Sequence, residues 1–292
     1  MLGEGGAVAD IRKLLPQNAD GEFFVDSTCV NCDTCRQLAP ATFGDTGDYA
    51  YVRAQPATVE ERRNALRALL CCPEGSIGTR GPNDAREVMA DFPLELDDGV
   101  YYCGFNSPKS FGGNSYFVRH PDGNWLIDSP KYLPRLVQRF EEMGGVRYIF
   151  LTHRDDVAEA ALYAERFGGR RIIHRADLDA QPDAEVVVEG DAPTRVQADF
   201  LVIPTPGHTE GHCVLLHRDR YLFTGDHLWW DRQAKRLGAS QDVCWYSWDE
   251  QRKSMANLLG YTFEWVLPGH GQRMRLPADE MARHLAALAQ RM

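Results

Sequence analysis

The stretch Pro206-Gly207-His208-Thr209-Glu210-Gly211-His212 follows an apolar run, Phe200–Ile203, and places two histidines on a glycine-rich loop. Imidazoles and carboxylates that follow buried strands, on loops whose glycines allow close approach, are typical of a metal site. Any one of these histidines could be structural, but a series of such loops indicates a metal centre and a fold that assembles it. Three further loops of this kind occur: Thr152-His153-Arg154-Asp155-Asp156, Thr224-Gly225-Asp226-His227 and Pro268-Gly269-His270-Gly271.

Strand and helix signals alternate around these loops. Ser115–Val118 and Trp125–Ile127 predict a β-hairpin, and Tyr148–Leu151 predicts a buried strand. Helices are expected from about Leu133 to Met143 and from about Asp156 to Phe167, each followed by a glycine pair. This alternation over roughly 200 residues predicts a layered α/β domain. Further strands are expected at 171–173, 200–203, 214–216, 221–224 and 265–267, and further helices at 247–259 and from Ala278.

The order of the four loops resembles the metallo-β-lactamase superfamily, and the resemblance runs from about Tyr101 to His270. It implies an αββα sandwich whose metal site lies along one sheet edge. It also implies ligand roles for His153, His208, Asp226 and His270.

The sequence departs from this family at its first metal motif, which usually reads H-x-H-x-D-H. Here it reads His153-Arg154-Asp155-Asp156-Val157-Ala158, so that Asp155 replaces the second histidine. Val157 and Ala158 replace the aspartate and histidine that normally hold a second metal. Because aliphatic side chains cannot bind a metal, a standard dinuclear zinc site is not expected.

The residues that remain are His153, His208 and Asp226. Two imidazoles and one carboxylate with open positions form the facial triad of non-haem Fe(II) sites. Persulfide dioxygenases of this superfamily keep a single iron on the same three motif positions. We therefore expect one mononuclear metal, with iron favoured and zinc as the alternative, unless His212 or His227 rebuilds a second site.

For other polar residues of these loops, the sequence leaves more than one role open. Asp155 is either a fourth ligand or the N-cap of the following helix. Asp156 is expected to oppose the dipole of that helix in preference to binding the metal. Without a second metal, His270 is expected to act as an acid, a base or a substrate contact. We assign catalytic roles to His270, His212 and Asp155, and expect Asp128 to tie a loop near the metal.

Four tryptophans flank an insertion that runs from Asp231 to Val243. They either form an aromatic wall over the pocket or pack in the core. The four are Trp229, Trp230, Trp245 and Trp248.

A second metal-binding motif precedes the large domain. Cys29-Val-Asn-Cys32-Asp-Thr-Cys35 places three thiols on one loop, and Cys72-Pro73 follows a helix capped by Thr58 and Glu61. A cubane cluster needs four converging thiolates, of which one loop can supply three. Zinc knots usually pair two C-x-x-C knuckles, so the pattern favours a [4Fe-4S] cluster on Cys29, Cys32, Cys35 and Cys72.

From Phe24 to Ile77 the sequence resembles single-cluster [4Fe-4S] ferredoxins. The resemblance includes Arg36–Pro40 after the third cysteine and Pro73–Ile77 after the fourth. It implies a small α+β ferredoxin-like domain with an electron-transfer role. Cys71 is expected to be a bystander, with an exchange of roles with Cys72 as the alternative.

These patterns predict two domains with a linker between them. We expect an N-terminal extension at 1–22, the ferredoxin-like domain at 23–80, a linker at 81–94 and the metallo-β-lactamase-like domain at 95–292. The 292 residues are 43% hydrophobic and 25% charged, as in ordinary globular proteins.

Charge and cysteine usage limit the partners and the compartment. The net charge of −10, without a Lys/Arg-rich run, argues against nucleic acid or an anionic membrane as the main partner. No apolar stretch approaches the roughly 20 residues of a membrane helix. Five of the eight cysteines lie between Cys29 and Cys72 and no export signal is evident, so reduced cysteines and a cytoplasmic location are expected.

Three functions are consistent with the sequence. The favoured one is a metal-dependent oxidoreductase whose iron is supplied with electrons by the fused cluster, because hydrolysis needs no electrons. The second is a mononuclear zinc hydrolase of an ester, thioester or lactone, with a structural or sensing cluster. The third is a non-enzymatic electron-transfer or sensing protein. A small-molecule substrate is expected, and an external electron donor and a homodimer are options.

Overall fold

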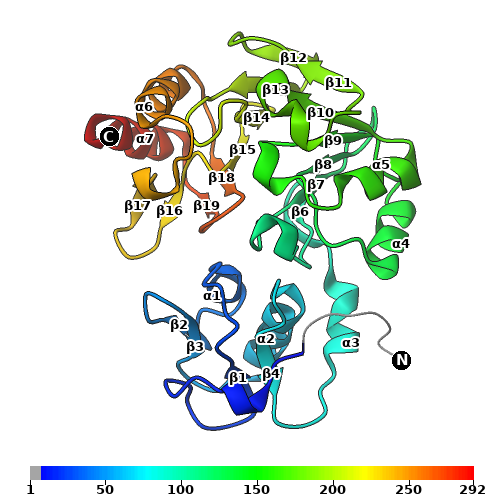
Figure 1. Ribbon diagram of the computed structural model, residues 1–292, viewed down its shortest axis with the longest axis vertical. Coiled ribbons are helices and arrows are strands. Elements are labelled where there is room, and N and C mark those ends of the chain that lie inside the picture. Colours follow the sequence, from blue (N-terminus) through cyan, green and yellow to red (C-terminus); the bar gives the residue numbers. More distant parts are fainter. Residues whose placement is uncertain (1–7) are drawn as a thin grey trace.

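The computed structural model describes residues 8–292, and Figure 1 shows a small domain beside a larger one. The first seven residues of the predicted N-terminal extension lie outside the described residues. Among residues 8–292, no helix has the length and apolar character needed to cross a membrane.

The small domain is built from two short strand pairs and two main helices. It comprises η1 (Ile11–Lys13), β1 (Phe23–Val25), α1 (Thr34–Leu38), β2 (Phe43–Asp45), β3 (Ala50–Val52), α2 (Val59–Cys71) and β4 (Ile77–Thr79). β1 pairs antiparallel with β4, and β2 pairs antiparallel with β3. This arrangement confirms the small α+β domain.

Helix α2 begins with the predicted capping box. The Thr58 side chain accepts a hydrogen bond from the Glu61 backbone N–H, and the Glu61 carboxylate accepts one from the Thr58 N–H. Its buried face includes Leu66, which packs in the core of the small domain. The helix ends at Cys71, which is buried with the core of the large domain. The helix therefore connects the cores of the two domains.

The first sheet of the large domain has seven strands in the order β11-β10-β9-β8-β7-β6-β5. Helices α4 (Pro134–Glu142) and α5 (Ala160–Phe167) cover its outer face (Figure 1). The strands from β8 to β11 are parallel and the others are antiparallel. The strands are β5 (Leu94–Asp97), β6 (Val100–Tyr102), β7 (Tyr116–Val118), β8 (Trp125–Ile127), β9 (Tyr148–Phe150), β10 (Arg170–His174) and β11 (Val186–Val188).

The second sheet has six strands in the order β12-β13-β14-β15-β18-β19. Helices α6 (Trp248–Asn257) and α7 (Ala278–Arg291) lie on its outer face (Figure 1). Its strands are β12 (Thr194–Gln197), β13 (Phe200–Pro204), β14 (Cys213–His217), β15 (Tyr221–Gly225), β18 (Trp265–Pro268) and β19 (Met274–Arg275), and a hairpin of β16 (Trp229–Asp231) and β17 (Arg236–Gly238) stands beside it. Short 3-10 helices connect these elements: η3 (Pro108–Ser110), η4 (Arg154–Asp156), η5 (Arg175–Ala180), η6 (Gln241–Val243) and η7 (Leu258–Gly260).

The two sheets face each other across one apolar core. Residues from both sheets, such as Phe117, Ile149, Phe223 and Leu267, belong to the same buried cluster. A second cluster fills the space between the second sheet and helices α6 and α7. Two sheets with helices on both outer faces confirm the predicted αββα sandwich.

One local prediction needs correction. The helix predicted from Asp156 instead begins at Ala160, because residues 154–156 form η4 and the Asp156 side chain is buried. The segment predicted as a linker, 81–94, contains α3 (Ala85–Val88) and η2 (Met89–Asp91). Within it, Val88 packs into the core of the small domain.

Candidate metal centre

Four loops bring ligand-type side chains to one edge of the sandwich. His153 follows strand β9, and His208 lies on the loop between β13 and β14. Asp226 directly follows β15, and His270 follows β18, the parallel neighbour of β15. All four loops leave the carboxyl end of a strand, which is why the fold can assemble them.

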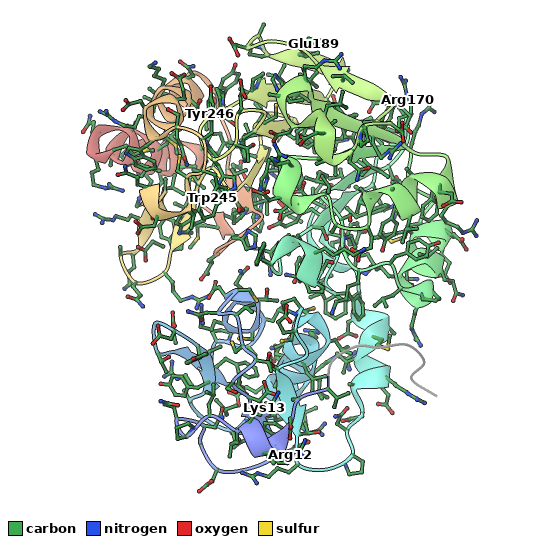
Figure 2. The ribbon with its side chains drawn as sticks, viewed as in Figure 1. Arg12, Lys13, Arg170, Glu189, Trp245 and Tyr246 are labelled. Carbon is green, nitrogen blue, oxygen red and sulfur yellow. The ribbon has the colours of Figure 1, made fainter. Side chains whose placement is uncertain are left out.

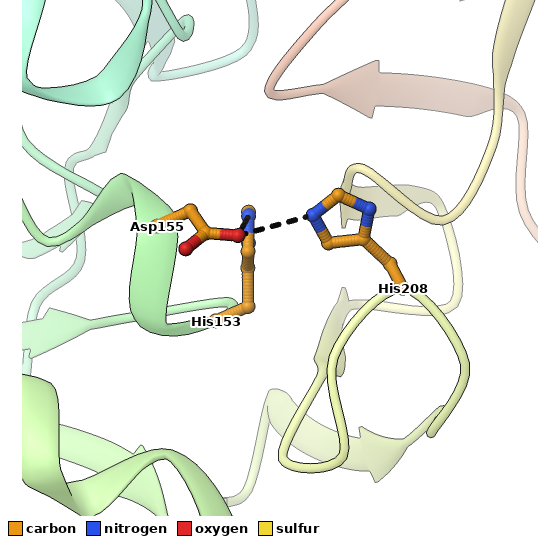
Figure 3. A group of neighbouring side chains, drawn as sticks. All are labelled: His153, Asp155 and His208. Atoms are coloured by element: carbon orange, nitrogen blue, oxygen red, sulfur yellow. Dashed lines mark ion pairs between the residues drawn. The ribbon is translucent and has the colours of Figure 1, made fainter. Parts of the chain in front are cut away.

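His153, Asp155, His208 and Asp226 surround one point. The His208 Nε2 atom lies 3.5 Å from Asp155 Oδ2 and 3.7 Å from Asp226 Oδ2. The His153 Nε2 atom lies 4.0 Å and 3.9 Å from the same two oxygens. In Figure 3 a dashed line joins the Asp155 carboxylate to the His208 imidazole, and the His153 ring is seen edge-on beside that carboxylate. His153, Asp155 and His208 form one possible ligand group, with donor atoms all within 4.8 Å of one another, and Asp226 lies near both imidazole nitrogens. Ligand bonds of about 2.0–2.2 Å place neighbouring donors at similar separations, so these side chains fit one divalent ion.

The two imidazoles are held by their other nitrogen atoms. His153 Nδ1 lies 3.0 Å from Thr152 Oγ1, and Thr152 in turn bonds to Asp128 through its backbone N–H and its hydroxyl. His208 Nδ1 lies 2.5 Å from the Val243 carbonyl oxygen. Neither Nε2 atom has a hydrogen-bond partner among the described residues. Imidazoles oriented in this way are typical of metal ligands.

Burial and charge act in opposite directions on these histidines. Burial lowers the pKa of His153 to about 4, so its imidazole is neutral near pH 7 and available as a ligand. Burial alone would also lower the pKa of His208, but Asp155 and Asp226 raise it overall. A cation at this point would replace the proton that these carboxylates favour.

Asp156 lies in the site, although the sequence interpretation preferred a helix-turn role for it over a ligand role. Its side chain is buried and neither carboxylate oxygen has a partner among the described residues. It forms a second possible ligand group with His153 and Asp226, whose donor atoms lie within 4.8 Å of one another. Burial, followed by the Asp226 charge, raises the pKa of Asp156 well above its usual range. The sequence signal for a site role was the position of Asp156 inside the first metal motif. We interpreted that position as the first turn of a helix.

His270 forms an ion pair with Asp226. Its Nδ1 atom lies 2.9 Å from each Asp226 oxygen, and its backbone N–H donates to the same carboxylate. Burial alone would lower the pKa of His270, but Asp226 raises it to about 10. In the absence of a metal, His270 is therefore protonated near pH 7.

His212 and His227 lie behind the site. The Nδ1 atom of His212 lies 2.9 Å from Thr205 Oγ1, and its Nε2 accepts from the Asp226 backbone N–H. With both nitrogens engaged and no contact with the cavity described below, His212 supports the Asp226 loop; the structure does not place it as a catalytic residue. His227 is fully buried, its ring 5.6 Å from that of His212, and it belongs to neither group of possible ligands.

The four predicted cluster cysteines line one enclosed cavity in the small domain, and Cys71 does not. Backbone N–H groups point at two of their sulfurs: Ser76 N lies 3.2 Å from Cys72 Sγ, and Ala50 N lies 3.4 Å from Cys29 Sγ. Burial raises the pKa of Cys32 to about 11, so its thiolate needs a cation for stability. Four converging sulfurs with N–H donors fit an iron-sulfur cluster.

One open cavity of about 940 Å³ is lined by residues of both the cluster loop and the metal centre. One wall is the cluster loop from Val30 to Asp33, and the metal residues Asp155, His208 and Asp226 lie on the other side. Several hydrogen bonds hold the domains together. They are Asn106 Nδ2 to Thr34 Oγ1 (3.0 Å), Gln37 Nε2 to the Gly271 carbonyl (2.8 Å) and Lys131 Nζ to the Pro73 carbonyl (2.8 Å).

The backbone at Gly112 touches the cluster segments directly. A Cβ atom at this position would lie 2.9 Å from Cys32 Cβ and 2.8 Å from Pro73 Cγ. Its carbonyl accepts a hydrogen bond from Asn106 Nδ2, the amide nitrogen that also bonds to Thr34. The loop after η3 is therefore fitted to the cluster-binding segment.

Comparisons with known proteins agree with both domains. Residues 25–79 match the family described as the 4Fe-4S single cluster domain of Ferredoxin I. The large domain superposes on the DIM-1 metallo-β-lactamase with a TM-score of 0.52 and 19% identity, over 68% of this chain and 95% of that one. A second structure, VMB-1, gives the same four values. The chain thus carries a single-cluster 4Fe-4S ferredoxin domain and a domain of the metallo-β-lactamase fold.

Curated relatives cover only part of the chain. A hydroxyacylglutathione hydrolase of Rhizobium etli is 32% identical over 142 residues, which are 47% of this chain and 52% of that protein. One of Xanthomonas oryzae is 33% identical over 110 residues, 37% of this chain and 43% of that protein. The chain therefore spans about half the length of these relatives.

The names of these relatives contradict one prediction. We expected a metal-dependent oxidoreductase in preference to a metallo-hydrolase, because a cluster is fused to the domain. The relatives that share the sequence of the large domain are named as hydrolases. The oxidoreductase assignment is therefore wrong: it relied on the presence of the cluster, which does not determine the chemistry of the neighbouring site.

Proposed function

We propose that this protein is a metal-dependent hydrolase that cleaves a thioester or ester. The observation that carries the proposal is the group His153, Asp155, His208 and Asp226, whose donor atoms surround one point at an open cavity. The hydrolase names of the partial relatives support the same class of reaction. A divalent ion held there would lower the pKa of a bound water and polarise a carbonyl group.

The surrounding residues have defined tasks in such a reaction. Thr152 and Asp128 fix the orientation of the His153 ring, and the Val243 carbonyl fixes that of His208. His270 bonds to Asp226 through Nδ1 and lines the cavity. We propose that His270 Nε2 donates the proton that the leaving group takes up. This nitrogen has no hydrogen-bond partner among the described residues.

Zinc is the metal that we propose for this site. Nitrogen and oxygen donors both bind zinc, and hydrolysis requires no change of oxidation state. Protein purified without oxygen is then expected to contain about four irons and four sulfides for the cluster and about one zinc per chain. The ferredoxin domain has a structural task in this proposal, because its loop forms one wall of the cavity.

The experiment that tests the proposal measures thiol release from simple thioesters. Protein reloaded with zinc after chelation should hydrolyse them, and the His208→Ala variant should lose at least about 100-fold in kcat/KM. His284→Ala, a change on helix α7 away from the cavity, serves as the control. Equal thiol release by the reloaded protein and the His208→Ala variant would reject the function.

A further inference from the structure

The cavity collects exposed apolar side chains. Eleven large hydrophobic residues are exposed in residues 8–292, and five of them line this one cavity. Aromatic rings dominate the group, and Trp245 and Tyr246 lie on the large domain in Figure 2. Exposed apolar groups that gather around a polar centre indicate a ligand with an apolar part. The five are Val30, Phe111, Val243, Trp245 and Tyr246.

The apolar group comes from three separate parts of the chain. Val30 belongs to the cluster loop and Phe111 follows η3. Val243 ends the insertion, and Trp245 and Tyr246 follow it. The backbone N–H groups of Trp245 and Tyr246 both donate to the His208 carbonyl. An apolar group that binds these rings would therefore lie next to the metal residues, within reach of the reacting carbonyl.

The charges around the cavity are mainly negative. Asp177 and Glu210 line it, and neither has a cationic side chain as an ion-pair partner within residues 8–292. Arg154 is the one lysine or arginine among the lining residues, and its guanidinium pairs with Asp179 at 2.5 Å. His270, the other cationic group at the cavity, is paired with Asp226, so within residues 8–292 the cavity offers no unpaired cation to an anionic ligand.

A bound metal ion and a bound cluster do not make the cavity positively charged. The carboxylates of Asp155 and Asp226 offset the two positive charges of one divalent ion, and His270, which also lines the cavity, is bonded to Asp226 through Nδ1. On the opposite wall, four thiolates outweigh the positive charge of a cubane core, so an occupied cluster adds negative charge. Both walls thus disfavour a ligand with carboxylate groups.

We propose that the substrate is a neutral or cationic thioester or ester with an aromatic or bulky apolar group, and that anionic thioesters are poor substrates. This inference rests on the proposed hydrolase function and specifies its substrate class. In the reaction, water adds its oxygen to the carbonyl carbon and the carbon–sulfur or carbon–oxygen bond breaks. The products are a carboxylic acid and a thiol or alcohol, and no oxidant or reductant is used.

The test uses three thioesters that share a phenylacetyl group and differ in the charge of the thiol. Thiocholine carries a positive charge, N-acetylcysteamine is neutral and 3-mercaptopropionate carries a negative charge. Values of kcat/KM for the first two should exceed that for the third by at least about tenfold at low salt, and the preference should shrink in high salt. An equal or higher value for the anionic thioester would overturn the inference while leaving the hydrolase function intact.

A binding measurement separates this inference from the function. The matching phenylacetyl amides, with the same three charges, are inert probes for calorimetry on the full chain with its cluster and metal in place. If no thioester is hydrolysed but the cationic and neutral amides bind more tightly than the anionic one, the ligand class holds and the function fails. Equal binding of the three amides would overturn the inference, whatever the rates are.

Two variants connect the preference to the residues that cause it. Glu210→Lys should shift the ratio of cationic to anionic kcat/KM by roughly tenfold toward the anion, because it reverses one charge at the cavity. Glu165→Lys makes the same charge change on helix α5, outside the cavity, and should leave the ratio unchanged. Trp245→Ala should lower the ratio of phenylacetyl to acetyl kcat/KM by about tenfold. Unchanged ratios in Glu210→Lys and Trp245→Ala would overturn the inference.

Discussion

Replacing Asp156 by asparagine should affect stability and metal binding in opposite directions. Oxygen atoms of Asp156 and Asp226 lie within 4.8 Å of each other, and both side chains are shielded from solvent. At an effective dielectric constant of about 20, two negative charges at that distance repel by about 3.5 kcal/mol. The charge of His270 offsets part of this repulsion. We therefore expect metal-free Asp156→Asn to be about 1–3 kcal/mol more stable than the parent protein at pH 8.

The sign depends on pH in a defined way. Because the pKa of Asp156 is raised in the folded state, the folded protein binds a proton there more readily than the unfolded chain does. Stability contributed by this group is therefore greatest at low pH and is lost as the pH rises. The gain from Asp156→Asn should be large at pH 8 and small at pH 5.5, which urea unfolding of the chelator-treated protein measures.

The affinity of Asp156→Asn for a metal ion should be lower than that of the parent protein. An amide has less charge to offer a divalent cation, so competition with a chromophoric chelator should show at least about tenfold weaker binding. Asp155→Asn is the matched control, since the Asp155 side chain is more exposed; it should weaken metal binding with little effect on metal-free stability. The reasoning fails if Asp156→Asn destabilises the metal-free protein at pH 8 or binds metal as tightly as the parent.

Three further predictions concern other parts of the molecule. Cys72→Ser should abolish the visible absorption of the iron-sulfur cluster, whereas Cys71→Ser should retain it; loss in both would contradict the bystander role of Cys71. Gly112→Ala should lower thermal stability, by roughly 1–3 kcal/mol, because the residue has a φ of 85° and its new methyl group would strike Cys32; an unchanged melting temperature would argue against the close contact. Burial lowers the pKa of His217 to about 4, so its contribution to stability is complete above pH 6.5 and is lost as the pH falls toward 4. Between pH 7.5 and 5 the His217 imidazole should lower the free energy of unfolding by about 2 kcal/mol, and His217→Gln should remove this loss in urea unfolding experiments. An unaltered pH dependence in the variant would contradict the prediction.

Local signals predicted much of the fold because they depend on near neighbours in the sequence. The capping box at Thr58 marks the start of α2, and Ser247 accepts from the Glu250 N–H at the start of α6. The hairpin of β7 and β8 follows from two apolar runs around a turn. Short edge strands such as β12, where two of the four residues are exposed, lack a continuous apolar pattern and were missed.

The site was less predictable because it depends on tertiary burial. The helix pattern placed Asp156 in a first turn, where a carboxylate normally faces water. In the structure, the backbone instead turns through η4 and directs this carboxylate toward Asp226, with Gly113 and Gly269 packed against it. The wall formed by Val30 depends on how two domains dock, and no pattern within either domain encodes that contact.

The fit between Gly112 and Cys32 has a consequence for how such a chain can diverge. A substitution that enlarges a side chain on one side of this contact must be matched by a substitution to a smaller side chain on the other side. Asn106, whose single side-chain amide bonds to both Thr34 and the Gly112 carbonyl, links the same two surfaces. The cluster-binding loop is therefore inherited as part of the pocket, and exchanging it for the loop of another ferredoxin would reshape the space in which the substrate lies.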